Sequence, residues 1–354
     1  MTYIVSADWH CHGWSQFSTV EDGVNSRLQH VMDEVERMAD QAERAGAKRV
    51  YVAGDIFHVR GSIKPTVFNV VSNTLSRLAS ERGIEFILMP GNHDLESVES
   101  EDISSAITSL GEIEGVRVYS KPVIIPEDRV ALLPWENTRE GLLAAVELLK
   151  RLINDMDERV CDYDLHLHTG INGVLIGVPD HGWSPEELAG FGFKRVFAGH
   201  YHDHAVFSID GCKVVSIGSP AHQTWRDVGS RSGFIEVQDD IFHQIETNAP
   251  SFVDFDIERD TTEYAGNFVR VRGVEMDESD VRAMREGLHE AGALGVTIDP
   301  LAKPEVTRDT KPTETLTVEG QIKDYASEDE DYGAEVEKGA LAVLKLAREV
   351  SVDE

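Results

Sequence analysis

Five short clusters of polar residues contain the residue types that bind divalent metal ions. Nine of the 14 histidines lie in these clusters or directly beside them, next to aspartate, asparagine or glycine. In chain order the clusters are Asp8-Trp9-His10, Gly54-Asp55-Ile56-Phe57-His58, Gly91-Asn92-His93-Asp94, His166-Leu167-His168-Thr169-Gly170 and Gly199-His200-Tyr201-His202. Carboxylate, imidazole and amide donors without thiolate suit Mn²⁺, Fe²⁺, Zn²⁺ or Mg²⁺. The donor set therefore indicates metal chemistry.

The number of donors favours two ions over one. The clusters hold more ligand-type residues than a single ion can use, but enough for two ions that share a carboxylate. Two ions roughly 3.5–4 Å apart can activate a water molecule and stabilise both oxygens of an in-line phosphoryl displacement. A histidine that binds neither ion can deliver a proton near neutral pH. A single such histidine is more often structural, so this inference depends on all five clusters together.

Buried strands are predicted directly before most of these clusters. Short apolar runs at Tyr3–Ala7, Arg49–Ala53, Glu85–Met89 and Arg195–Ala198 lead into Asp, Gly or Asn. Segments with helical spacing separate them, and strand ends collect side chains along one edge of a sheet. We predict an α/β fold, a layered β-sandwich flanked by helices, followed by a small C-terminal α+β cap domain.

The predicted domain boundaries follow changes in pattern along the chain. Residues 1–247 form the metal-binding domain, residues 248–325 the α+β cap, and residues 326–354 an acidic linker with a C-terminal helix. Within the cap, Asn267–Val274 and Ala293–Ile298 are predicted strands and Asp277–Ala291 a helix. The clusters all precede the cap, which places the chemistry in the first domain.

Composition narrows the possible partners and the compartment. The formal net charge is -31, which argues against a large basic groove that binds nucleic acid through its net field. Metal ions would supply local positive charge that this count omits. The three cysteines are widely spaced, no apolar run is long enough to span a membrane, and no leader is recognisable at the N-terminus. We expect a cytoplasmic protein with reduced thiols.

Over roughly residues 1–245, the sequence resembles the calcineurin-like metallophosphoesterase superfamily. The resemblance lies in the motifs and their order, D-x-H, G-D-x-x-H, G-N-H-D, H-x-G and G-H-x-H. Within it, Gly54–His58 and the strand–helix–strand tail resemble the SbcD branch, the nuclease subunit of a double-strand-break repair complex. Phage-encoded members of that branch are similar, which would place the protein in the host cytoplasm. The resemblance implies a nuclease, acting as an exonuclease or endonuclease, that hydrolyses DNA phosphodiester bonds in repair or recombination.

The same resemblance implies a role for each motif residue. It implies two divalent ions, expected to be Mn²⁺. The first would be held by Asp8, His10, Asp55 and His202, and the second by Asp55, Asn92, His168 and His200. His93 would act as general acid or stabilise the transition state, and His58 would help to position the phosphate. His166 shares a strand face with His168 and stays open as the alternative ligand.

The SbcD resemblance also implies partners, namely DNA, an SbcC-like coiled-coil ATPase held by the helix at 340–350, and a second copy in a homodimer. Two other functions stay open. One is a phosphoesterase for nucleotides or other small phosphoesters, which the acidic charge supports. The other is a non-catalytic, metal-bearing subunit of a DNA-processing complex. Four more histidines, His12, His181, His204 and His222, are expected at the surface or in structural roles.

Overall fold

The computed structural model describes residues 1–96, 105–175, 182–299, 317–326 and 333–350. The chain divides into a compact unit of residues 1–301 and a second unit of residues 302–354. In the second unit, α6 (Val318–Ala326) contacts α7 (Gly333–Val350), and α7 includes the helix predicted at 340–350. Residues 327–332 of the predicted acidic linker lie outside the described residues, and the predicted domain boundaries stay predictions. None of the described helices meets the length and apolarity that a membrane span requires.

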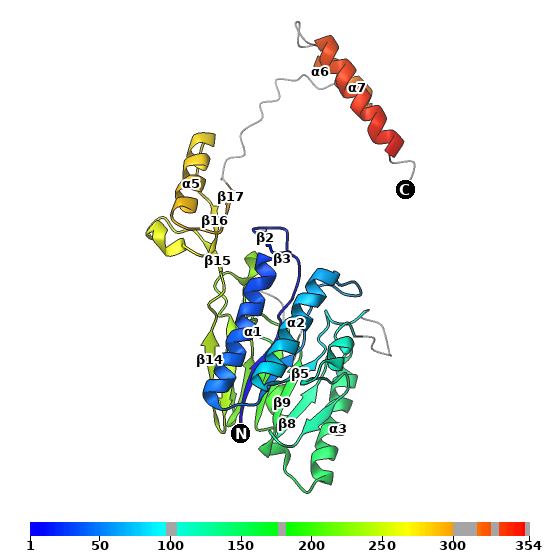
Figure 1. Ribbon diagram of the computed structural model, residues 1–354, viewed down its shortest axis with the longest axis vertical. Coiled ribbons are helices and arrows are strands. Elements are labelled where there is room, and N and C mark those ends of the chain that lie inside the picture. Colours follow the sequence, from blue (N-terminus) through cyan, green and yellow to red (C-terminus); the bar gives the residue numbers. More distant parts are fainter. Residues whose placement is uncertain (97–104, 176–181, 300–316, 327–332, 351–354) are drawn as a thin grey trace. The chain divides into compact units, whose positions relative to one another are not determined.

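The first large sheet is mixed and has six strands in the order β14-β13-β1-β4-β5-β6. Its strands are β1 (Thr2–Ser6), β4 (Arg49–Ala53), β5 (Glu85–Met89), β6 (Val116–Val118), β13 (Gly233–Gln238) and β14 (Ile241–Glu246). Figure 1 labels two of these strands, β14 and β5. The central strands β1, β4 and β5 run parallel, and each forms where the sequence predicted one. Their carboxyl ends therefore lie at the same edge of the sheet.

The second large sheet also has six strands, in the order β11-β12-β10-β9-β8-β7. Its strands are β7 (Val123–Ile125), β8 (Val130–Leu133), β9 (Asp164–His168), β10 (Arg195–Gly199), β11 (Ala205–Ile209) and β12 (Cys212–Ser216). Strands β8, β9 and β10 are parallel, and Gly199 at the end of β10 pairs with His168 at the end of β9. These strand ends form a second row of functional positions.

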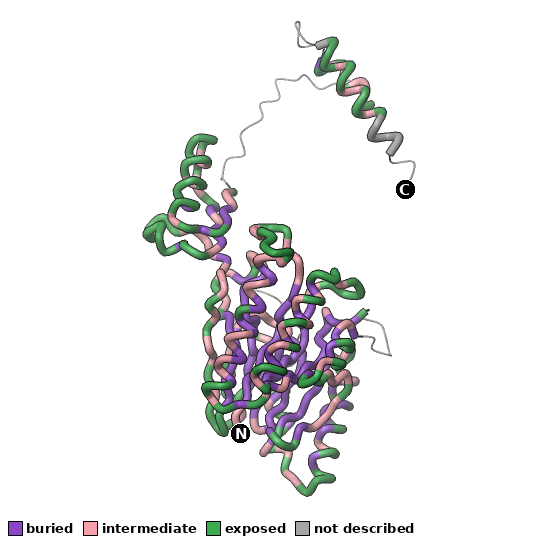
Figure 2. Tube along the Cα trace, viewed as in Figure 1, coloured by how far each residue is buried: buried purple, intermediate pink, exposed green. Residues whose placement is uncertain are grey.

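Helices cover the outer faces of both sheets. The helices are α1 (Ser26–Ala45) and α2 (Pro65–Arg82) on the first sheet, and α3 (Arg139–Asp155) and α4 (Pro185–Ala189) on the second. The two sheets pack against each other through large side chains such as Tyr3, Tyr51 and Phe197. Figure 2 shows the inner strands as the buried part of this unit, whereas β14 at the edge of the first sheet is partly exposed. The arrangement confirms the predicted helix-flanked sandwich.

Local sequence explains where the two helices on the first sheet begin and end. The Asn25 side chain accepts backbone N–H bonds at the start of α1, and Gly46 ends that helix at φ 71°. Helix α2 begins with Pro65 at its first turn, as predicted, because the missing N–H of proline costs nothing there. A two-stranded ribbon of β2 (Val20–Glu21) and β3 (Val24–Asn25) precedes α1.

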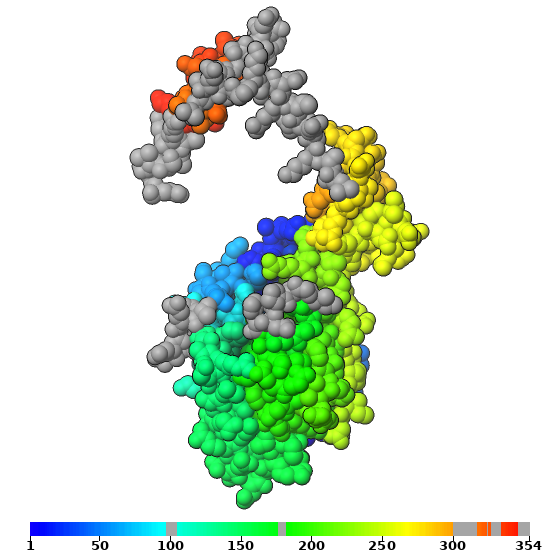
Figure 3. All heavy atoms as spheres, turned by 180° about the vertical axis from the view of Figure 1, so that it is seen from behind, coloured from blue at the N-terminus to red at the C-terminus, as the bar shows by residue number. Residues whose placement is uncertain are grey.

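A third, three-stranded parallel sheet follows the sandwich. Its elements are β15 (Phe252–Asp254), β16 (Phe268–Arg272) and β17 (Gly295–Asp299), with α5 (Glu278–Glu290) as the crossover between β16 and β17. Figure 3 shows this region in yellow as a small lobe on the larger body. The Phe17 ring stacks on Phe268 with centroids 5.5 Å apart, and the Arg27 guanidinium lies 5.0 Å from the Phe252 ring. These contacts join the small lobe to the sandwich.

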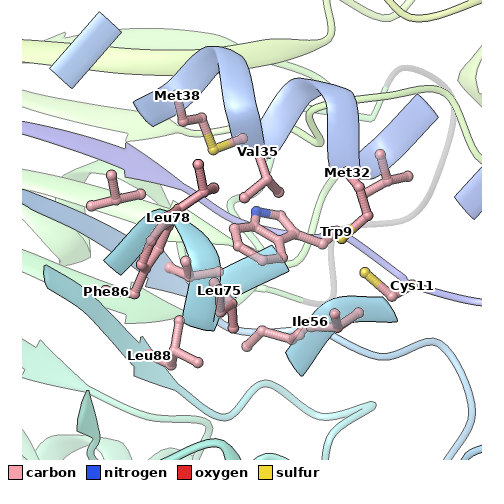
Figure 4. Packing of buried hydrophobic residues seen from close by; sticks show 14 of the residues in the cluster. Trp9, Cys11, Met32, Val35, Met38, Ile56, Leu75, Leu78, Phe86 and Leu88 are labelled. Carbon is pink, nitrogen blue, oxygen red and sulfur yellow. The ribbon is translucent and has the colours of Figure 1, made fainter. Parts of the chain in front are cut away.

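The core holds the first functional loop in place through Trp9. Its side chain is fully buried, and its indole N–H donates to the Ser6 hydroxyl at 3.0 Å. Figure 4 shows the indole packed between Val35 of α1 and Leu75 of α2. Because Trp9 lies between Asp8 and His10, this packing fixes the residues on either side of it.

Candidate metal centre

Every predicted ligand, and both predicted catalytic histidines, lie at or just after the carboxyl end of a parallel strand. The pairs are Asp8 and His10 after β1, Asp55 and His58 after β4, Asn92 and His93 after β5, and His200 and His202 after β10, while His168 ends β9. The first three loops come from one sheet and the last two from the other. The sandwich brings the two rows together, so that residues up to about 190 positions apart come into contact.

Three triads of donors lie at this edge: His10, His58 and His93 form one of them, and the other two hold only predicted ligands. Donor atoms of Asp8, His10 and His202 all lie within 4.8 Å of one another, as do those of Asp55, His168 and His200. The Asp55 Oδ2 atom connects these last two triads, since it lies 3.7 Å from His10 Nε2 and 3.4 Å from His168 Nε2. A carboxylate between two donor sets has the position that a bridging ligand requires.

Asn92 adds an amide oxygen to the triad of Asp55, His168 and His200. Its Oδ1 lies 3.2 Å from His168 Nε2 and 3.0 Å from His200 Nδ1. The Arg60 guanidinium donates to the Asn92 carbonyl at 2.9 Å and fixes the loop behind it. The structure therefore places Asn92 together with His168 and His200.

His93 and His58 lie beside the triad of Asp8, His10 and His202 without belonging to it. The His93 Nδ1–H donates to the His58 carbonyl at 2.7 Å, which leaves Nε2 available to a substrate. The backbone N–H of His93 donates to Asp55 Oδ1 at 2.8 Å. The His58 ring stacks on His93 with centroids 5.5 Å apart and contacts His10, so three imidazoles share one corner. An imidazole held this way can transfer a proton.

Two predicted ligands are oriented by a hydrogen bond on their far nitrogen. His168 Nδ1–H donates to the Ala53 carbonyl at 2.7 Å, which directs Nε2 toward Asp55. His202 Nδ1 lies 2.9 Å from Asp227 Oδ1, and the other Asp227 oxygen accepts the backbone N–H of Gln223 at 2.7 Å. Such partners fix the tautomer and the ring orientation of metal-binding histidines.

Asp227 could not be identified from the sequence, because it lies 25 residues after His202 in a short 3₁₀ turn. Trp135 was also missed. Its ring stacks on His200 with centroids 5.4 Å apart. Trp135 comes two residues after β8, and that strand-end position was a usable signal because the predicted ligands occupy equivalent positions.

Asp94 fixes the loops of the site. Its carboxylate accepts backbone N–H bonds from Ile56, Phe57 and Gly91, at 2.9–3.2 Å. Burial raises the pKa of Asp94 to about 7, and the nearby Asp55 carboxylate adds to the rise. Asp94 therefore joins the loop after β4 to the loop after β5.

The backbone of the site is strained where the predicted ligands lie. Asp8, His10, Asp55 and His200 all have positive φ, at 56°, 45°, 56° and 107°. Residues other than glycine rarely adopt this region, and such strain gathers at functional sites. A Cβ on Gly91 would come within 2.2 Å of Asp55 Oδ1, so glycine is required for the loops to approach this closely.

The electrostatics of the site show carboxylates and imidazoles forced together. Burial raises the pKa of Asp8 to about 7, and Asp55 adds to the rise. Burial also opposes the charged form of His168, but the adjacent Asp55 carboxylate outweighs it and raises the pKa of His168 to about 9. Burial lowers the pKa of His200 to about 3. Two buried carboxylates with inward-facing imidazole and amide donors fit divalent cations, which would offset the carboxylate repulsion.

The other sequence candidates lie outside the three triads. His166 is buried between the sheets, with Nε2 3.3 Å from the Tyr3 hydroxyl. His204 donates to the Ile217 carbonyl, and His222 contacts the Ser230 carbonyl and the backbone N–H of Phe252. The His12 ring packs on His58. His181 lies outside the described residues.

Comparison with known proteins shows which family the chain matches. Residues 1–204 match the model of the calcineurin-like phosphoesterase family. A DNA double-strand break repair protein Mre11 from Sulfurisphaera tokodaii is 27% identical over 201 residues, which cover 55% of this chain and 49% of that protein. The chain thus spans about half the length of this curated relative.

Two solved structures are also similar to parts of this chain. A dimetal phosphatase from Danio rerio has a TM-score of 0.38 and 11% identity, covering 67% of this chain and 91% of that one. An archaeal phosphodiesterase has a TM-score of 0.36 and 14% identity, covering 70% and 99%.

Proposed function

The chain belongs to the calcineurin-like phosphoesterase family, and from this premise we propose that it is a dinuclear-metal phosphodiesterase that hydrolyses DNA phosphodiester bonds. The observation that carries the proposal is the pair of donor triads joined by Asp55 Oδ2, with the His93 imidazole at their side. A metal-dependent hydrolase needs this combination of ion-binding groups and a proton donor.

We assign the residues as follows. Asp8, His10 and His202 would hold one ion and Asn92, His168 and His200 the other, and the Asp55 carboxylate lies within reach of both groups. When bound, two such ions, proposed to be Mn²⁺, would supply an activated water molecule and positive charge for an in-line displacement at phosphorus. Oxygen and nitrogen donors are what Mn²⁺ accepts.

The protein's own residues orient the metal-binding histidines and protonate the leaving group. Asp227 and the Ala53 carbonyl hold His202 and His168 so that Nε2 of each faces the donor cluster. His93 donates the proton from Nε2 to the leaving 3′-oxygen, because its Nδ1 is already bonded to the His58 carbonyl. His58 stacks on His93 and limits the rotation of that ring, and its own imidazole helps to position the phosphate.

DNA as substrate is supported by the similarity to a protein named for DNA double-strand break repair. We further propose that the chain acts with an SbcC-like coiled-coil ATPase through α7 and as a homodimer. Nucleotides or other small phosphoesters are the second candidate substrates, and the net charge of -31 favours them because a long polyanion is repelled by it.

The test is Mn²⁺-dependent degradation of end-labelled linear duplex DNA, with bis-para-nitrophenyl phosphate assayed in parallel. We expect label release that requires the metal and falls at least about a hundredfold in His93→Ala. His243→Ala is the matched control, since that imidazole is half exposed on β14. Hydrolysis of the small diester with DNA left intact would contradict the DNA assignment and favour small phosphoesters.

A further inference from the structure

A cavity of about 210 Å³ opens next to the metal centre, between the loop after β1 and the segment that joins β4 to α2. Phe57 and Val67 line it and are buried, with 0% and 3% of their surface exposed. Val59 and Ile63 also line it, and Val59 is 37% exposed. The cavity therefore has an apolar interior and opens to solvent. None of the predicted ligands lines it.

The cavity shares a wall with the imidazole cluster. His12 lines it, and the His12 ring packs against His58 with centroids 5.3 Å apart. Phe57 directly precedes His58 and pairs with Cys11 in an isolated β-bridge, one residue after His10. A group bound here would lie directly beside the place where the phosphate is proposed to react.

The lining also carries a positive charge. Lys64 lines the cavity and is exposed, in a chain whose net charge is -31. An ammonium group beside an apolar cavity suits a ligand with an apolar ring and an adjacent anionic group. The cavity is smaller than the roughly 300–1,000 Å³ of drug-sized sites, so a single ring system fits it better than a peptide or a lipid chain does.

We propose that this cavity binds the nucleobase adjoining the scissile phosphodiester, with Lys64 contacting a phosphate of the same strand. The inference rests on the proposed function and adds to it a subsite for the base. Van der Waals contact with Phe57 and Val59 and stacking on the His12 ring would stabilise any of the four bases, so the subsite favours DNA over simple alkyl diesters without selecting a sequence.

The experiment compares an oligonucleotide that the wild-type protein cleaves with the same oligonucleotide made abasic on both sides of the cleaved bond. Val59→Trp fills the cavity from its exposed side. Ile241→Trp is the matched control, because Ile241 is 70% exposed and pairs with Gln238, which pairs with Thr2 at the opposite end of β1. Lys64→Gln removes the charge. Binding of both oligonucleotides in EDTA, followed by fluorescence anisotropy, gives a readout that does not depend on metal.

We expect the wild-type protein and Ile241→Trp to cleave the intact oligonucleotide about tenfold faster than the abasic one and to bind it more tightly. In Val59→Trp, the cleavage rate and the affinity for the intact oligonucleotide should fall to those for the abasic one. Lys64→Gln should weaken the salt dependence of binding. Equal binding and cleavage of the two oligonucleotides by the wild-type protein would overturn the base subsite and leave the nuclease intact. Failure of the wild-type protein to cleave DNA at all would overturn the proposed function and this inference with it.

Discussion

This protein has two polar clusters, one buried between the sheets and one at the strand ends, and they differ in what balances their charge. In the inner cluster, Asp164 accepts two bonds from the Arg195 guanidinium, at 2.7 and 2.5 Å, and one from the Tyr3 hydroxyl at 2.6 Å. At the strand ends, Asp8 and Asp55 meet imidazoles instead, and no arginine or lysine is recorded in ion-pair contact with them among the described residues.

The two histidines of β9 show what this difference does. Burial and the Arg195 charge lower the pKa of His166 to about 3, so that imidazole is neutral. His168 is equally buried, yet Asp55 raises its pKa to about 9. Two residues of one strand face thus have opposite shifts because only one of them faces an uncompensated carboxylate.

The two clusters also differ in backbone conformation. Tyr3, Asp164 and Arg195 lie within regular strands, whereas Asp8, His10 and Asp55 have left-handed φ values. A charge-balanced cluster on relaxed backbone stabilises the fold, and an unbalanced cluster on strained backbone is suited to bind ions. The following predictions test this contrast.

The largest effect is expected for Asp55→Asn, which removes the carboxylate that connects the triads. Mn²⁺-dependent hydrolysis of bis-para-nitrophenyl phosphate should fall by about a thousandfold, more than the roughly 10–100-fold typical of outer-shell partners. The fold should persist, as measured by circular dichroism. Activity within tenfold of wild type would contradict the bridging assignment.

The converse substitution, Asp164→Asn, should act on stability. It leaves the Arg195 guanidinium buried without its carboxylate, and breaking such a pair costs about 3 kcal/mol or more of unfolding free energy. Urea denaturation measures this, and Mn²⁺ affinity should stay unchanged. Asp162→Asn is the control, because its pair with Arg159 is solvent-exposed and should have no measurable influence. Equal stability of the two variants would show that the inner cluster is not structural.

A smaller effect is expected for Asp227→Asn, which leaves His202 without its charged partner. Mn²⁺ affinity measured by calorimetry should fall about 10–100-fold. Asp203→Asn serves for comparison, because Asp203 is adjacent to His202 in sequence but accepts the backbone N–H of Arg231. If both variants bind Mn²⁺ as the wild type does, Asp227 does not orient a ligand.

Per pH unit, the smallest effect is expected for the dependence of Mn²⁺ affinity on pH. In the metal-free protein the pKa of His168 is raised to about 9, so a proton occupies its imidazole at neutral pH and competes with the ion. Affinity should rise with pH by up to about tenfold per unit until pH 9, because each unit removes that competing proton more completely. Below about pH 7 the slope should steepen as Asp8, whose pKa is about 7, also takes up a proton. Titrations at pH 6.5, 7.5 and 8.5 measure this, and a flat profile would show that no proton on His168 competes with the ion.

Much of the fold was accessible from sequence because its signals are local. Strands β4 and β5 form at the predicted residues, and α2 begins at the predicted proline, since apolar runs and proline act within their own segment. The layered sandwich is confirmed, and the family match covers the predicted motifs between residues 1 and 204. The sequence alone therefore determined the fold class, the strand-end positions of the motifs and the type of donor.

Only the tertiary structure decided which donors meet. Strand periodicity puts His166 and His168 on one face, so it cannot tell which of them reaches Asp55, 113 residues away from His168 in the chain. Asp227 beside His202 and Trp135 on His200 likewise depend on how loops of different strands fold over the sheet edge. These contacts form where the two sheets pack together, and each sheet is encoded by its own segments of the sequence. A local sequence pattern indicates whether its own element is buried, but not which residue of the other sheet it will contact.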